Sequence, residues 1–223
     1  ARTREDIERV ADDLRARDWL AFAQVCDVTR EPDVKALGAE ARRVLGTVDI
    51  LVNNAGTAAA AKLENITLED WNAMLAVNAT GTFLCTREML PGMTSRGWGR
   101  VINIASIAGL EGARLIAHYA AAKHAVVGFT RAMAAETAGT GVTVNAVCPG
   151  YADTPLTERT LASVQARTGM PRDRALAAVL ASSGQDRLVS PAEIAAEVVR
   201  LSLEGAAGNT GGTIVLGVGV RTP

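Results

Sequence analysis

Two hydrophobic patterns alternate along this chain from one end to the other. Short, almost continuous apolar runs are separated by longer stretches in which apolar residues recur every three or four positions. The runs are typical of strands buried on both faces, and the stretches are typical of amphipathic helices. We expect strands over the residue ranges 21–28, 48–56, 99–106, 141–150 and 212–218.

The periodic stretches predict helices, and two of them begin with a capping-box signature. Thr3 with Asp6, and Thr67 with Asp70, combine a hydroxyl with a carboxylate three residues later. A less regular helical stretch runs from 154 to 186. We expect regular helices over the residue ranges 3–18, 31–46, 67–90, 118–138 and 190–203.

Strands that alternate with helices predict βαβ units, and therefore an α/β fold with a parallel sheet covered on both faces. No repeat, low-complexity tract or linker interrupts residues 1–223, so we expect one domain. In such sheets, ligands bind beyond the carboxyl ends of the strands. The unusual polar and small residues follow this rule, at or just past predicted strand ends: Asp27, Asn53–Gly56, Ser106 and Pro149–Gly150.

The composition narrows the class of protein. Hydrophobic residues make up 48% of the 223 positions and the net charge is −1, which is typical of a globular domain and excludes a disordered tail or a basic nucleic-acid binder. The three cysteines form no CxxC pair and no cluster of metal ligands. No apolar run is long enough to span a membrane. We therefore expect a cytoplasmic protein with no metal, nucleic acid or membrane partner.

A tyrosine and a lysine stand four positions apart in the segment HYAAAKH. On a helix, Tyr119 and Lys123 share one face and can reach one cavity. A phenol with its ordinary pKa is a poor base near neutral pH, and a neighbouring ammonium lowers that pKa. The pair therefore suggests proton-transfer chemistry, although a tyrosine at the edge of the core beside a solvated lysine would give the same pattern.

Two further polar residues are candidates for the same site. Ser106 ends a predicted strand thirteen positions before Tyr119, where its hydroxyl could bind the same substrate oxygen. Asn78 lies inside a predicted helix, although asparagine is a mediocre helix former. Taken alone, each is better explained by a local structural role, Ser106 as a turn or cap residue and Asn78 through a hydrogen bond to nearby backbone.

Together with six motifs in order, these residues resemble the short-chain dehydrogenase/reductase family over essentially the whole chain. The motifs are CDV, NNAG, LAVNATG with Asn78, NIASIAG with Ser106, YAAAK, and NAVCPGYADT. NAVCPG and KHAVVGFT are most similar to the bacterial ketoacyl and aromatic-polyketide ketoreductases. The resemblance implies a Rossmann-like, doubly wound parallel sheet and hydride transfer between a nicotinamide cofactor and a carbonyl or alcohol.

The resemblance also implies a role for each catalytic candidate. Tyr119 protonates the substrate oxygen during reduction, and Ser106 holds and polarises that oxygen. Lys123 lowers the pKa of Tyr119 and binds the nicotinamide ribose, and Asn78 fixes a water that links Lys123 to solvent. Donors held in place before charge develops on the oxygen are the physical basis of such a site.

Cofactor contacts carry over in the same way. They fall on Asp27 and Val28 for the adenine, on Asn53, Ala55 and Gly56 for the ribose and pyrophosphate, and on Pro149, Gly150 and Thr154 around the nicotinamide. Arg2 aligns just past the family's second strand, where a basic residue pairs with the adenosine 2′-phosphate. This favours NADP(H) over NAD, with an exposed terminal arginine as the alternative.

The chain departs from the family pattern at its start. Family members begin with a strand and a TGxxxGxG turn that holds the pyrophosphate, and this chain has neither. The segment GAAGNTGG does not replace that turn, because it precedes a predicted strand and not a helix. We therefore expect that about forty N-terminal residues, with the first strand, the Gly-rich turn and the first helix, are missing.

Residues 151–187 occupy the place of the family's substrate-covering loop and helices. Arginines in this segment at 159, 167 and 172 could meet the phosphate of a carrier-linked or CoA-linked substrate, or simply be solvated. The family usually forms homodimers or homotetramers through its two long helices. We expect an NADP(H)-dependent reductase of a 3-oxoacyl thioester or polyketide. The alternatives are a dehydrogenase of a small alcohol, sugar or steroid, and an inactive nucleotide-binding scaffold.

Overall fold

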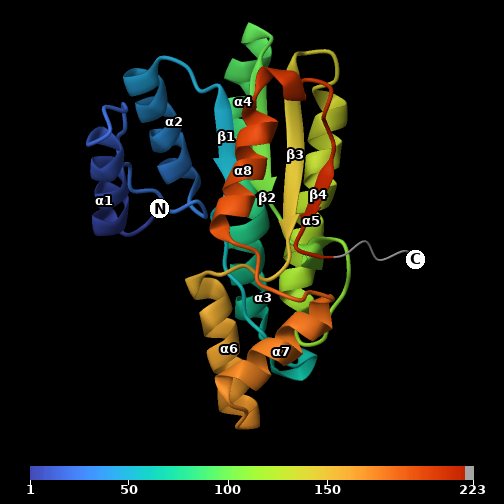
Figure 1. Cartoon of the computed structure of the whole chain (residues 1–223). Helices are drawn as coiled ribbons and strands as arrows, with labels where there is room; N and C mark the ends of the chain where they lie inside the picture. The colour runs from blue at the N-terminus through green and yellow to red at the C-terminus, as the bar shows by residue number, and fades with distance from the viewer. Residues whose placement is uncertain (219–223) are drawn as a thin grey trace.

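A parallel sheet forms the centre of this protein, whose computed structural model describes residues 1–218 (Figure 1). Its strand order is β1-β2-β3-β4, and every neighbouring pair is parallel. Register places Asn53 opposite Asn103, and Ile104 opposite Val147, so the strand ends with polar residues meet at one edge. The strands are β1 (Ile50–Asn53), β2 (Gly99–Ile104), β3 (Val142–Pro149) and β4 (Thr213–Leu216).

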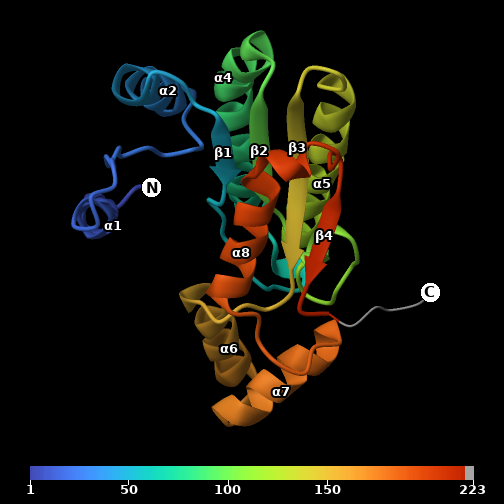
Figure 2. The same cartoon turned by 45° about the horizontal axis from the view of Figure 1, so that its top comes forward.

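Helices cover both faces of the sheet, as a doubly wound fold requires (Figures 1 and 2). In the view of Figure 1, α8 lies in front of the strands, α4 and α5 lie behind them, and α6 and α7 lie beyond their carboxyl ends. The helices are α1 (Arg4–Arg15), α2 (Glu31–Leu45), α3 (Leu68–Leu75), α4 (Gly81–Arg96), α5 (Ala117–Glu136), α6 (Pro155–Thr168), α7 (Arg172–Ser183) and α8 (Pro191–Ser202).

The core lies on both sides of β2, because successive strand residues point to opposite faces. Val101 packs with Met93 of α4 and Val144 of β3 on one face. Ile102 packs with Val147 and with Leu201 of α8 on the other. Each of these side chains is almost completely buried, and burying one contributes about 1.5–3 kcal/mol. This packing holds the strand ends that carry the polar residues.

The predicted helix over 67–90 contains a wider turn that the periodicity does not reveal. The chain forms α3, then a π-helical turn over Ala76–Thr80, and then α4. The predicted capping box at its start is confirmed, since Thr67 and Asp70 exchange side-chain-to-backbone hydrogen bonds of 3.0 and 3.1 Å. The box predicted at the start of α1 is wrong. No side-chain cap forms at Thr3, and Asp6 instead lies 3.6 Å from the Arg9 guanidinium.

The strand predicted over 21–28 is also wrong. The segment is extended, and the amide of Cys26 donates to the carbonyl of Ala1 at 2.9 Å, but no ladder within residues 1–218 includes it. A strand needs a hydrogen-bonded neighbour, and this segment packs its Cys26 and Val28 near Leu51 of β1 without pairing to it. Among residues 1–218 no strand pairs with the outer edge of β1, and its Ile50 and Val52 are 44% and 40% exposed.

Candidate active site

Three side chains predicted to act together meet at the carboxyl edge of β2, close to the start of α5. Ser106 follows β2 and caps a short turn over Ile107–Gly109, its Oγ accepting the amide of Ala108 at 3.1 Å. The hydroxyl of Ser106 lies close enough to the phenol of Tyr119, on the first turn of α5, to lower the pKa of that phenol. A hydroxyl and a phenol that lie this close can both bond to one substrate oxygen between them.

Lys123 lies one turn along α5 from Tyr119 and is buried. Its Nζ donates a 2.9 Å hydrogen bond to the carbonyl of Ile104 and lies 5.9 Å from the centre of the Tyr119 ring. Burial lowers the pKa of Lys123 to about 8, because the charged ammonium is poorly solvated there. The predicted convergence of hydroxyl, phenol and ammonium is present in this structure.

The pKa of Tyr119 differs from the expectation that Lys123 would lower it. Burial raises the pKa of the phenol above its ordinary value, the nearby hydroxyl of Ser106 opposes this, and the nearby phenol of Tyr151 adds to the rise. Lys123 does not offset the rise, because its own pKa is lowered to about 8 and it is neutral where the phenol ionises. Tyr119 is therefore held protonated at neutral pH, as an acid requires.

Asn78 lies in the π-helical turn, where its amide binds two segments. Nδ2 donates to the carbonyls of Met74 and Thr57, both at 3.0 Å, and Oδ1 accepts the amide of Thr57 at 3.2 Å. Asn78 is 1% exposed, so these contacts hold the loop after β1 against the helix. A Cβ placed on Gly56 of that loop would lie 3.1 Å from Asn78 Oδ1 and 3.7 Å from Lys123 Nζ. The asparagine, the glycine and the lysine thus border one small space.

Gly109 is a residue of the site that sequence reasoning missed. A Cβ there would lie 2.7 Å from the backbone oxygen of Lys123, a distance that real contacts do not allow. The glycine lets the turn after Ser106 lie directly on α5 and so sets the spacing between Ser106 and Tyr119. Gly109 is the last residue of the motif NIASIAG, and this place in the motif could have identified it.

The structure brings Arg2 and Asp27 together at a second place on this edge. The Cys26 amide bonds the Ala1 carbonyl, so the start of the chain runs beside Asp27. Asp27 Oδ1 accepts the amide and hydroxyl of Thr29 at 2.9 and 2.8 Å, which lowers its pKa, and the charge of Arg2 adds to the effect. Val28 packs where a Cβ on Gly81 would lie, 2.7 Å from its Cγ2.

Asn53 contributes its side chain to the interior. Nδ2 donates to Thr86 at 3.0 Å and to Asn103 at 2.8 Å, and Asn103 in turn donates to Thr130 at 2.8 Å. This buried network braces the sheet edge beneath the site, so a contact from Asn53 to a cofactor would come from its backbone. The following residues, Ala55 and Gly56, are exposed.

The remaining predicted residues lie at the end of β3. Pro149 is the last residue of that strand, and the Gly150 amide donates to the Leu216 carbonyl of β4 at 3.0 Å. Thr154 precedes α6 and is half-buried. Of the arginines on the covering segment, Arg172 is ion-paired with Glu158 and is thus already neutralised.

These residues fit the nicotinamide half of a dinucleotide cofactor. The space beside Gly56, which a Cβ would narrow, lies against the Lys123 ammonium, a donor, and Asn78 Oδ1, an acceptor, and ribose hydroxyls can bond to both. Residues 1–218 offer no TGxxxGxG turn for the pyrophosphate. They also contain no group of three or more metal-binding side chains and no helix long and apolar enough to cross a bilayer.

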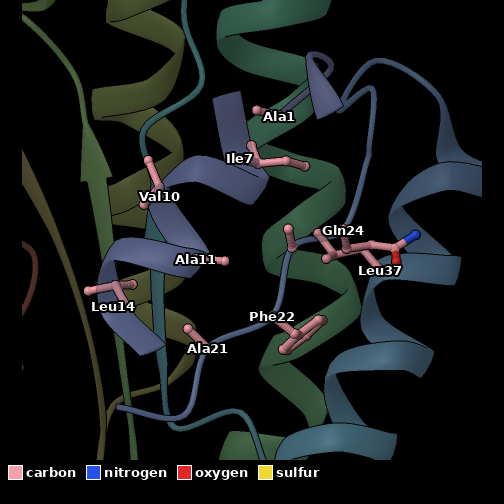
Figure 3. A pocket seen from close by; sticks show the side chains of 10 residues that line it. Ala1, Ile7, Val10, Ala11, Leu14, Ala21, Phe22, Gln24 and Leu37 are labelled. Atoms are coloured by element: carbon pink, nitrogen blue, oxygen red, sulfur yellow. The ribbon is translucent and has the colours of Figure 1, made fainter. Parts of the chain in front are cut away.

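A separate pocket of about 340 Å³ lies between α1 and α2 (Figure 3). Its side chains are nearly all apolar and none is a candidate acid, base or nucleophile, so it is not part of the candidate active site. The lining residues are Ala1, Ile7, Val10, Ala11, Leu14, Ala21, Phe22, Ala23, Gln24 and Leu37.

Comparisons with known proteins point the same way as the geometry. The family profile described as short chain dehydrogenase matches residues 1–165. A D-beta-hydroxybutyrate dehydrogenase of Cupriavidus necator is 41% identical over 181 residues, which are 81% of this chain and 70% of that protein. A putative ketoacyl reductase of Streptomyces coelicolor is 38% identical over 212 residues, covering 94% of this chain and 81% of that protein.

A solved structure shares the whole fold. The crystal structure of a single-residue variant of actinorhodin polyketide ketoreductase with NADPH superposes with a TM-score of 0.93 at 36% identity. The match covers 100% of this chain and 86% of that one. The Rossmann-like fold predicted from the sequence is therefore confirmed.

Proposed function

This chain belongs to the short-chain dehydrogenase family, and from that premise we propose that it is an NADP(H)-dependent reductase of 3-oxoacyl thioesters or related ketones. The observation that carries the proposal is the neighbouring pair of Ser106 and Tyr119 with Lys123 one turn away. The 38% identity to a putative ketoacyl reductase and the fold shared with a polyketide ketoreductase support the substrate class.

The chain's own residues would perform the proton chemistry. A nicotinamide held beside Lys123 and the loop of Gly56 would supply the hydride for the carbonyl carbon. Tyr119 donates its phenolic proton to the carbonyl oxygen while Ser106 donates a hydrogen bond to the same atom. The ammonium of Lys123 stabilises the phenolate that remains, and Asn78 keeps the loop of Gly56 beside Lys123. Tyr119 is protonated near neutral pH, so its proton is present when the carbonyl oxygen needs it.

The choice of NADP(H) rests on the surroundings of Asp27. Arg2 places a positive charge at this position, where a 2′-phosphate would be bound, and the similar polyketide ketoreductase was solved with NADPH. The adenine would lie against Asp27 and Val28, with Ala55, Gly56 and the backbone of Asn53 along the ribose and pyrophosphate. Pro149, Gly150 and Thr154 would border the nicotinamide.

The covering segment 151–187 would close over the substrate from α6 and α7. Its inner side chains Leu161, Ala175 and Val179 form one apolar cluster, which suits an acyl or polyketide chain. Arg159 and Arg167 are exposed and suit a carrier or CoA phosphate. We place the protein in the cytoplasm, as a homodimer or homotetramer.

A second candidate function is supported by one specific observation. The 41% identity to a D-beta-hydroxybutyrate dehydrogenase favours a dehydrogenase of a small hydroxy acid or alcohol. Both functions use the same catalytic residues, so they differ in substrate and direction. An inactive scaffold is the least supported alternative, since all four predicted catalytic side chains are present.

The test is NADPH oxidation followed by absorbance with ethyl 3-oxobutanoate or a 3-oxoacyl thioester as substrate. We expect turnover with NADPH to exceed turnover with NADH. The Tyr119→Phe variant should lose about 10²–10⁴-fold in kcat, the usual contribution of a general acid, with NADPH affinity nearly unchanged. If the variant retains its turnover, Tyr119 is not the proton donor. If the wild type oxidises 3-hydroxybutanoate faster than it reduces any ketone, the second candidate replaces the first.

A further inference from the structure

The residue after Pro149–Gly150 brings a second phenol to the site. Tyr151 packs against the apolar cluster of α6 and α7, and its phenol is close enough to that of Tyr119 to raise the pKa of that group. Burial also raises the pKa of Tyr151, so its hydroxyl stays neutral and can donate. The hydroxyl of Tyr151 forms no hydrogen bond within residues 1–218, and it is not one of the fully buried, unpaired polar atoms of that part of the chain. It is an accessible donor beside an apolar wall.

A buried amide fixes the backbone that carries this phenol. Gln185 is 7% exposed and binds both the backbone amide and the backbone carbonyl of Tyr151. Its Oε1 accepts the Tyr151 amide at 2.7 Å, and its Nε2 donates to the Tyr151 carbonyl at 3.1 Å. Oε1 also accepts the Ser183 hydroxyl at 2.8 Å, and Nε2 donates to the Arg187 carbonyl at 3.2 Å. All polar positions of the amide are used, so its orientation is fully defined.

The neighbouring glycine is fitted to this amide. A Cβ on Gly150 would lie within 2.8 Å of three atoms of the Gln185 amide group, so only glycine allows the approach. An apolar residue at 185 would fill the space without the cost of burying an amide. The four hydrogen bonds of Gln185 therefore do more than fill this space. They fix the direction in which the backbone leaves β3 at Tyr151.

We propose that Tyr151 is a specificity-determining residue that donates a hydrogen bond to a second oxygen of the substrate, and that Gln185 is the positioning residue that aims it. The substrate class is a ketone with a further carbonyl oxygen close to the reacting one, as in 3-oxo esters and thioesters. Tyr119 and Ser106 bind the oxygen that is reduced, and Tyr151 binds the other. This inference rests on the proposed function, because it assigns the second contact of the same site.

Two ketones of matched length test the contact. Ethyl 3-oxobutanoate carries the second oxygen, and 2-heptanone has the same chain length without it. With Tyr151→Phe we expect kcat/KM to fall about tenfold for the ester, the value of one hydrogen bond, and to stay within about twofold for 2-heptanone. Equal effects on the two ketones would overturn the role of Tyr151.

The positioning role of Gln185 has its own readout. Gln185→Leu should lower the ratio of kcat/KM for the ester to that for 2-heptanone, because the phenol is no longer aimed. In the double variant with Tyr151→Phe, the ratio should fall no further than in Tyr151→Phe alone, since both changes remove the same contact. A purely structural glutamine would lower both rates together or add its effect to that of Tyr151→Phe, and either result rejects the positioning role.

Binding separates this inference from the proposed function. The dissociation constant of ethyl 3-oxobutanoate is measured by ligand-observed NMR titration, with and without NADPH. Absent turnover by the wild type would reject the proposed reaction, whereas weaker binding to Tyr151→Phe would still support the contact. Equal dissociation constants, or no binding to the wild type, would overturn it.

Discussion

Lys123 shows how one buried charge affects both chemistry and stability. The residue is 5% exposed, its ammonium donates to the Ile104 carbonyl, and burial lowers its pKa to about 8 from an ordinary 10.5. A lysine whose pKa is lower in the folded state destabilises the fold while it is charged. The residue that we propose stabilises a phenolate during proton transfer therefore lowers the stability of the resting protein.

This cost predicts a pH dependence of stability. The unfolded chain binds the proton more tightly between pH 8 and 10.5, so the contribution of Lys123 to unfolding free energy should rise across that window, by about 3 kcal/mol in total. At pH 7, Lys123→Met should melt at a higher temperature than the wild type, and the difference should shrink towards pH 10. Thermal denaturation by circular dichroism at several pH values measures this.

The difference in melting temperature between the wild type and Lys123→Met isolates the contribution of the lysine. Tyr119, Cys85 and Cys148 also have raised pKa values, which lower stability as pH rises above the ordinary pKa of each group, but they are present in both proteins. A melting-temperature difference that stays constant from pH 7 to pH 10 would contradict the assignment.

Sequence reasoning found residue identities better than residue environments. Tyr119, Lys123, Ser106 and Asn78 could be named from spacing and motif, and the structure brings them to one edge. The direction of the Tyr119 pKa shift could not be predicted, because it depends on burial and on the nearby phenol of Tyr151. Gln185 was missed, since nothing in the chain ties that position to Tyr151 until both are folded.

At the scale of elements, the π-helical turn over Ala76–Thr80 and the short turn over Ile107–Gly109 orient the side chains of the candidate site. Asn78 takes the Met74 carbonyl with its own side chain, competing with the backbone ladder where the helix widens. Periodicity predicts one helix there because it records which face is apolar and not how the ladder is bonded. The segment 21–28 was predicted as a strand for a similar reason, because its composition suits a sheet but pairing depends on a neighbour.

Gly109 gives an element-scale prediction. Gly109→Ala should force the turn over Ile107–Gly109 away from α5, separating Ser106 from Tyr119. We expect a loss of about 1–3 kcal/mol in unfolding free energy, as for other overpacked positions, together with a clear drop in kcat. Gly112→Ala is the matched control, because a Cβ there meets nothing within 4 Å. Similar behaviour of the two variants in melting and activity assays would remove Gly109 from this role.

At the scale of the whole molecule, the outer faces of α4 and α5 present an aromatic pair. Phe83 is 40% exposed, and its ring meets that of Phe129 edge-on with centroids 6.2 Å apart. Arg87 lies over the Phe83 ring at 4.9 Å. Aromatic and arginine side chains are enriched at interfaces, so this face suits the proposed homo-oligomer.

The assembly prediction follows from that face. Phe83→Glu should shift the protein from dimer or tetramer towards monomer in light scattering after size exclusion, because a charge would be buried at the contact. Leu68→Glu, at an exposed position 74% accessible on α3, should leave the assembly unchanged. A monomeric wild type, or equal masses for wild type and Phe83→Glu, would reject the α4–α5 face as the interface.

The outer side of β1 has a consequence for any extended segment that joins this sheet. Its backbone donors and acceptors point outward next to half-exposed Ile50 and Val52, with no strand beside them among residues 1–218. Such a row is a template to which another extended segment can pair. A segment added there would cover both side chains and supply partners for the unpaired backbone groups, so the hydrophobic layer on that side would become continuous with the rest of the sheet.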